Sequence, residues 1–99
     1  MKSINRVTLI GKIVDKTPIV ESVDAVKNRV VPCCEAELNT TMKVYQNKSQ
    51  TETQTHKHKL IAYDHCGRIL DKIKIGYPAL VAGRLVDGVV VVNLINAIK

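Results

Sequence analysis

Alternating apolar and polar residues predict β-strands in the first half of this chain. We expect the first strand at Asn5–Val14 and a short extended segment at Ile19–Val23. The run Asp15-Lys16-Thr17-Pro18 between them is typical of a turn. A second strand is expected at Val30–Thr40. The segment Thr41–Gln54 contains few apolar residues, so it is interpreted as a long, flexible hairpin loop.

The segment Thr55–Tyr63 contains no Gly or Pro and is interpreted as a third strand. Side chains alternate between the two faces of a strand, which places Lys57, Lys59 and Tyr63 on one face. His58 belongs to the other face, which becomes apolar toward the end of the segment. One face therefore carries two ammonium groups and an aromatic ring, as a surface for a polyanion with stackable bases would.

A short helix is predicted next, over Cys66–Ile75, because its apolar residues form one stripe. Gly76 stands where a helix is expected to end. Ala79–Leu85 is a fourth strand and Val89–Ala97 a fifth. The Asp87-Gly88 dipeptide between these apolar runs indicates a two-residue hairpin turn.

This order predicts an all-β domain covering residues 1–99: a five-stranded Greek-key barrel with one short helix between strands three and four. It is the order of the oligonucleotide-binding (OB) fold, whose central strands and neighbouring loops bind single strands or oligosaccharides. The sequence shows no internal repeat and no linker to a second domain.

Composition narrows the class of partner. The chain has a net charge of +6 and a pI of about 9.4, which favours an anionic partner. Apolar residues make up 45% of it, but no apolar run has the length of a membrane span. The N-terminus has no apolar signal core, and the three cysteines do not form a disulfide framework, so we expect a cytoplasmic protein with reduced thiols.

Two stretches resemble the bacterial single-stranded DNA-binding proteins (SSB): Ile4–Ile13, and Thr55–Leu85 with its strand-helix-strand order and final Gly-Arg-Leu. The resemblance implies single-stranded DNA binding in replication, recombination or repair. Lys57 stands where the family usually has a stacking tryptophan, and Tyr63 where it has a stacking phenylalanine. The same alignment puts His58 on a histidine of the inward or interface face and Lys59 on a basic position. It also implies basic or polar contacts at Arg6, Lys12 and Arg84.

The chain departs from that family in three respects: it has no tryptophan, its last hairpin is a tight turn, and no acidic tail follows Lys99. Partners recruited through such a tail are therefore not expected. A short, tail-less chain is also similar to the primosomal PriB proteins, dimeric relatives with the same fold. Stacking contributes roughly 1–3 kcal/mol per base, so lysine in place of a ring should make binding weaker and more dependent on salt.

The expected function is non-catalytic, sequence-nonspecific binding of single-stranded DNA, with RNA as the alternative because stacking and phosphate contacts serve both. Lys57, Lys59 and Tyr63 are the expected central contacts. Peripheral contacts are expected from the other basic residues and from the hairpin, namely Arg6, Lys12, Arg84, Lys43, Tyr45 and Lys48. A homodimer or homotetramer is expected, with His58, Val90 and Val92 at the interface.

Other chemistries fit the sequence less well. His56, His58, His65 and Cys66 contain metal-binding side chains, but their spacing does not bring four ligands together, so no metal or other cofactor is expected. Asp64, His65 and Cys66 are adjacent, whereas a catalytic triad must converge from separate positions, so no enzyme activity is expected. Two alternatives remain open: a PriB-like replication-restart protein and an OB barrel devoted to protein contacts.

Overall fold

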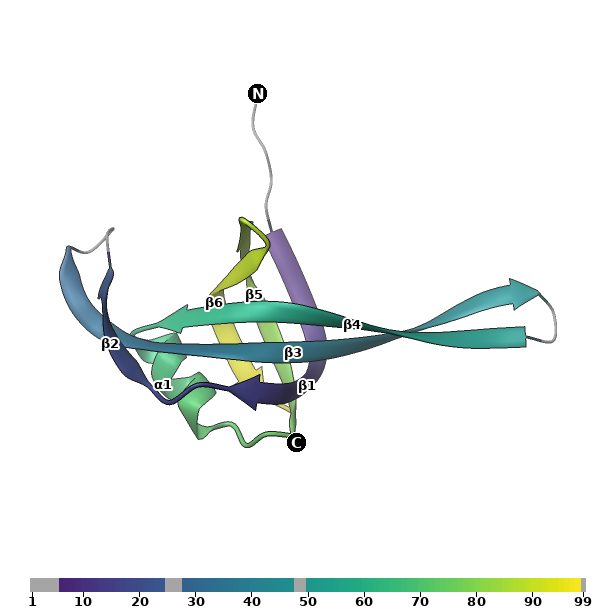
Figure 1. Ribbon diagram of the computed structural model, residues 1–99, viewed down its shortest axis with the longest axis horizontal. Coiled ribbons are helices and arrows are strands. Elements are labelled where there is room, and N and C mark those ends of the chain that lie inside the picture. Colours follow the sequence, from purple (N-terminus) through teal and green to yellow (C-terminus); the bar gives the residue numbers. More distant parts are fainter. Residues whose placement is uncertain (1–5, 25–27, 48–49, 99) are drawn as a thin grey trace, which may run out of the picture.

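The computed structural model describes residues 6–24, 28–47 and 50–98 of the chain. They form one sheet that curves into a closed barrel, with a single helix packed against it (Figure 1). The elements in chain order are β1 (Arg6–Lys16), β2 (Val20–Asp24), β3 (Arg29–Asn47), β4 (Gln50–Tyr63), α1 (His65–Lys72), β5 (Pro78–Val86) and β6 (Val89–Ala97).

The barrel closes because β1 pairs with two different strands. Its first part, Arg6 to Lys12, is antiparallel to β5, and its last part, from Lys12 to Lys16, is antiparallel to β3. The other neighbours follow in the order β5, β6, β4, β3, with β6 and β4 parallel. The predicted barrel of five strands, with a helix between its third and fourth, is confirmed. The short β2 pairs only with β3, outside the barrel.

Gly11 permits the sharp change of partner in β1. A Cβ atom at this position would lie 2.1 Å from the backbone oxygen of Asn39 on β3. Real Cβ atoms do not approach a backbone oxygen this closely, so β1 and β3 come together here only because residue 11 has no side chain. A glycine within a strand often marks such a close approach of two backbones.

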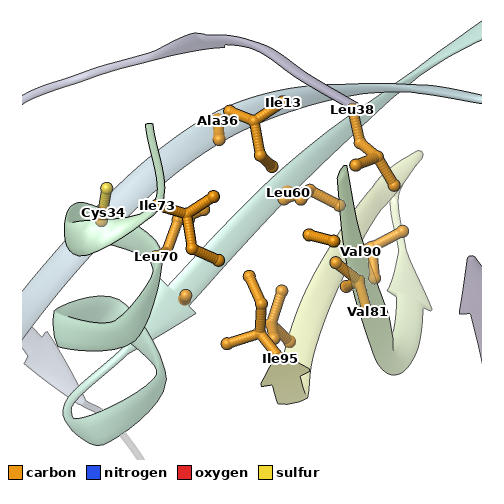
Figure 2. Close-up of a cluster of buried hydrophobic side chains, with 13 residues drawn as sticks. Ile13, Cys34, Ala36, Leu38, Leu60, Leu70, Ile73, Val81, Val90 and Ile95 are labelled. Atoms are coloured by element: carbon orange, nitrogen blue, oxygen red, sulfur yellow. The ribbon is translucent and has the colours of Figure 1, made fainter. Parts of the chain in front are cut away.

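The core fills the barrel between the sheet and α1. Alternate residues point inward within the barrel, namely Cys34, Ala36 and Leu38 of β3, Leu60 and Ala62 of β4, and Ala79 and Val81 of β5. Leu70 and Ile73 close one end of the barrel (Figure 2). The helix is shorter than predicted: it ends at Lys72, and Ile73 has an extended conformation. Lys16 explains part of this ending, because its Nζ donates hydrogen bonds to the carbonyl oxygens of Asp71 and Ile73, each at 2.6 Å.

The interpretation of Thr41–Gln54 as a loop is wrong. β3 and β4 continue through this segment as a two-stranded ribbon that projects from the barrel (Figure 1). Threonines are frequent here, and β-branched residues favour strands. The turn predicted at Asp87-Gly88 is confirmed: both residues have positive φ, 50° and 80°, as a type I′ hairpin turn requires.

Candidate nucleic-acid interface

The outward face of β4 carries the three residues that the sequence places at the centre of the site. Lys57 and Lys59 are exposed and Tyr63 is half-buried, whereas Leu60 and Ala62, on the opposite face, lie in the core. The alternation predicted for this strand is confirmed. The two lysines therefore face solvent on the outside of the barrel, where a ligand can reach them.

Lys12, Asn39 and Lys57 form one row across three strands. Lys12 of β1 is paired with Asn39 of β3, and Asn39 is paired with Lys57 of β4. Neighbouring strands are about 4.8 Å apart, so two ammonium groups flank one carboxamide. Within the described part of the chain, the Oδ1 atom of Asn39 is buried and has no hydrogen-bond partner. We call Lys12, Asn39 and Lys57 the basic row. It brings Lys12, an expected peripheral contact, into the same row as Lys57, an expected central contact.

The adjacent row has a different charge. Glu37 of β3 lies directly opposite Lys59 of β4, and Asp15 of β1 lies opposite Glu37. Val89 of β6 follows Lys59 in the same row. The expectation from the sequence rested on the side chains of β4 alone, and the neighbouring strands add these carboxylates to its face. We call this second row the acidic row, because it contains two carboxylates and one ammonium group.

Tyr63 lies well away from Lys57. Six residues of strand separate them, which corresponds to roughly 20 Å at about 3.4 Å per residue. Tyr63 is paired with Cys33, and the pair of Ile61 and Glu35 stands between it and Lys59. Tyr63 therefore shares the face of the two lysines but is not part of a compact cluster with them.

The expected peripheral residues lie in two regions. Arg6 and Arg84 are exposed and directly opposite each other across β1 and β5, beyond the bend at Gly11. The backbone of Lys43 and Tyr45 belongs to the ribbon, where these residues are paired with Thr53 and Thr51. The side chains of Lys43 and Tyr45, and all of Lys48, lie outside what the structure describes.

The expected interface residues require a correction. Val90 and Val92 are only 1% and 6% exposed, because they face the interior of the barrel and belong to its core. They are therefore not available to a second copy of the chain. His58 is half-buried at the end of the core, where its Nε2 lies 3.0 Å from Thr40 Oγ1.

The cysteines serve packing. Cys33 and Cys34 are both buried, and both are free thiols. Burial raises the pKa of both thiols; nearby Glu35 adds to the effect at Cys33, and Asp71 at Cys34. Cys66 is half-buried, and its Sγ lies 3.4 Å from the carbonyl oxygen of Asn93.

Two absences concern the described residues only. In ranges 6–24, 28–47 and 50–98, no three or more His, Cys, Asp or Glu side chains are grouped so that they could hold a metal ion. Over the same ranges, no helix is long and apolar enough to cross a membrane.

Sequence reasoning did not single out Asn39, Glu37 and Asp15. The alternation in β3 already separates Glu37 and Asn39 from the core residue Leu38. Their neighbours on β4, however, depend on the register of the β3–β4 hairpin. An interpretation of the ribbon as a loop leaves that register undefined. The threonines on both sides of residues 48 and 49 favour strands there, but composition alone does not set the register.

The closed barrel, its parallel contact between β4 and β6, and the helix between β4 and β5 define an OB fold. No protein-family model and no curated protein sequence matches the chain.

Solved structures do match. PriB from Ralstonia solanacearum superposes with a TM-score of 0.75 at 16% identity, covering 98% of this chain and 100% of that one. The small single-stranded DNA-binding protein from Streptomyces coelicolor gives 0.70 at 18% identity, covering 99% and 96%. SSB from Plasmodium falciparum, in complex with single-stranded DNA, gives 0.69 at 18% identity over the same shares. At these identities the likeness establishes the fold that this chain shares with PriB and SSB proteins.

Proposed function

We propose that this chain binds single-stranded DNA without sequence specificity and without catalysis, on the outward face of β3 and β4. The observation that carries the proposal is the basic row, in which Lys12 and Lys57 flank Asn39 on three adjacent strands. β3 and β4 are the second and third strands of the barrel, the face that OB folds use for oligonucleotides. The net charge of +6 favours the same class of ligand.

We propose that Lys57, Lys59 and Lys12 contact phosphates and that the ring of Tyr63 stacks on a base. Arg6 and Arg84 provide a second pair of charges beyond the bend. We also propose a contact from Lys43 on its charge and one from Tyr45 on its aromatic ring. Lys48 is retained as a contact on its charge alone. Binding in this arrangement is mainly electrostatic.

A competition experiment tests this function. A fluorescent oligothymidylate is bound to the protein and displaced by unlabelled single-stranded DNA, single-stranded RNA or duplex DNA. We expect single-stranded DNA to compete better than duplex, and log K to fall with log salt by about 0.7 for each phosphate neutralised. Duplex competing as well as single strands, or an affinity independent of salt, would contradict the proposal.

We also propose that the chain self-associates, through the apolar part of the outward face of β1, β5 and β6 around Ile10 and Leu94, which leaves Arg6 and Arg84 free at the end of the β1–β5 pairing. Ile10 and Leu94 on this face are 62% and 46% exposed. Arg6 to Gly11 pair with β5 on one side, whereas the described pairing with β3 on the other side begins only at Lys12. An apolar face beside an open strand edge suits a second copy of the same chain.

Light scattering measures the oligomeric state directly. We expect a dimer or tetramer for the wild type and a monomer for Ile10→Lys. Val20→Lys, on the exposed β2 outside the barrel, is the matched control and should keep the wild-type mass. A wild-type protein that is monomeric at all concentrations tested would reject self-association.

A further inference from the structure

A groove of about 330 Å³ crosses the proposed binding face, and its charges do not suit a nucleic acid. Three acidic residues line it, Asp15, Glu35 and Glu37, together with Lys16 and Lys59. The Nζ of Lys16 donates to two backbone carbonyl oxygens at the end of α1. The Lys59 ammonium is the remaining positive charge in the groove, and Glu37 lies directly opposite it.

The basic row and the acidic row lie side by side on this face. Along β4 they are two residues apart, Lys57 and Lys59, which corresponds to about 7 Å. This separation is shorter than the screening length of about 10 Å at 0.1 M salt, so a phosphate at one row experiences the charges of the other. A phosphate beside Lys57 has two ammonium groups in its row, whereas one beside Lys59 has two carboxylates in its row.

Farther along the same face, the acidic character continues toward Tyr63. Glu35 is exposed and is paired with Ile61, the next outward residue of β4 after Lys59. In the other direction, toward the ribbon, the pair after Asn39 and Lys57 is Thr41 with Thr55, and both of these residues are without charge. The face is therefore divided at the acidic row into a basic half and an acidic half.

We propose that Asp15, Glu35 and Glu37 determine where the bound strand lies: it crosses the sheet at the basic row and continues toward Thr41 and Thr55, without entering the groove. This inference rests on the proposed single-strand binding and refines it. This narrows the contacts proposed above. Lys57 and Lys12 hold the strand, whereas Lys59 lies at its edge and contributes less than Lys57 to affinity. Tyr63, beyond the acidic row, does not contact the strand. The carboxylates also limit how many nucleotides one barrel binds.

Matched variants test the position of the strand, by fluorescence anisotropy with oligothymidylates of increasing length at several salt concentrations. Lys57→Gln is compared with Lys59→Gln, since both remove one exposed positive charge from β4. We expect Lys57→Gln to lower the affinity and reduce the salt slope by about 0.7. Lys59→Gln should produce less than half of either effect.

A second pair tests the carboxylates. Glu37→Gln is compared with Glu21→Gln, an exposed carboxylate on β2 outside both rows. The two variants have the same net charge. Removing one charge about 7 Å from a phosphate should raise the affinity about threefold at low salt, from Coulomb's law in water. We expect this gain, and a longer bound oligonucleotide, for Glu37→Gln only.

The outcomes separate this inference from the function on which it rests. A wild-type protein that binds none of the oligonucleotides rejects the proposed function itself. If the wild type binds but Lys59→Gln costs as much as Lys57→Gln, the inference is overturned and the strand crosses the groove. Equal effects of Glu37→Gln and Glu21→Gln would also overturn it. Circular dichroism melting of each variant shows whether the fold is retained. If Glu37→Gln melts at a lower temperature than the wild type, Glu35→Gln takes its place in the comparison.

Discussion

Arg6 and Arg84 lie directly opposite each other on adjacent strands, both exposed, at the end of the β1–β5 pairing. Like charges in such a cross-strand pair destabilise a sheet. Two guanidinium groups held together are, however, well suited to bind a phosphate. The pair therefore has a cost in the free protein that a bound anion would offset.

Arg84→Gln should consequently affect stability and binding in opposite directions. We expect the free energy of unfolding to increase by up to about 0.5 kcal/mol at low salt, because the repulsion from Arg6 is removed. The gain should disappear at 1 M salt, where the screening length is only about 3 Å. Urea unfolding measures the first effect, and anisotropy with an oligothymidylate should show a lower affinity. Lys74→Gln, at an exposed residue between α1 and β5, is the control and should leave stability unchanged.

Gly11→Ala should destabilise the barrel strongly. The new Cβ would overlap the backbone oxygen of Asn39, so β1 or β3 must move at the point where the barrel closes. Overpacking of this kind costs typically about 1–3 kcal/mol, and here the obstacle is backbone, so we expect a value at the upper end. Chemical denaturation monitored by circular dichroism provides the measurement.

Gly88→Ala is the informative comparison for that variant. Gly88 has a φ of 80°, and nothing lies within 4 Å of the position that a Cβ would occupy. Its substitution should cost only the conformational preference, roughly 1 kcal/mol. A Gly11→Ala protein as stable as Gly88→Ala would show that β1 can move away from Asn39 without loss.

The barrel itself could be predicted because its strands alternate apolar and polar residues, as at Leu60, Ile61 and Ala62, and because Asp87-Gly88 has the chemistry of one particular turn. The ribbon could not be predicted by periodicity, because Met42, Val44 and Tyr45 are the only apolar residues of Thr41–Gln54. Periodicity needs a longer run of alternating apolar residues than these three provide.

The division of charge on the face could not be predicted for a related reason. The sequence alone shows that Lys57 and Lys59 share a face, and this is confirmed. It does not show that Glu37 is the neighbour of one and Asn39 of the other, because that depends on how β3 and β4 are aligned. A shift of one residue would reverse every outward side chain of one strand.

Val90→Ala distinguishes a core residue from an interface residue. Val90 is 1% exposed within a single chain, so its truncation removes buried apolar atoms and leaves a cavity. We expect a loss of about 1.5–3 kcal/mol in the free energy of unfolding, with no change of oligomeric state. Urea unfolding and light scattering on the same sample measure both. A variant that dissociates into monomers of unchanged stability would show that Val90 is an interface residue.

The stability of the protein should decrease in alkali because of its buried thiols. The Cys34 side chain is fully buried, and burial raises its pKa from the ordinary value of 9.0. Above pH 9 the unfolded chain loses this proton while the folded chain keeps it. The folded state then binds more protons, so stability falls as pH rises, until the pH passes the pKa of the folded state. The slope for one thiol is at most about 1.4 kcal/mol per pH unit.

Urea unfolding of wild type and Cys34→Ala from pH 8 to 10.5 isolates this contribution, because lysine and tyrosine titration is common to both. Below pH 8 the difference between the two proteins should be constant, and above pH 9 it should shrink. A difference that stays constant over the whole range would show that the Cys34 thiol titrates alike in the folded and unfolded states.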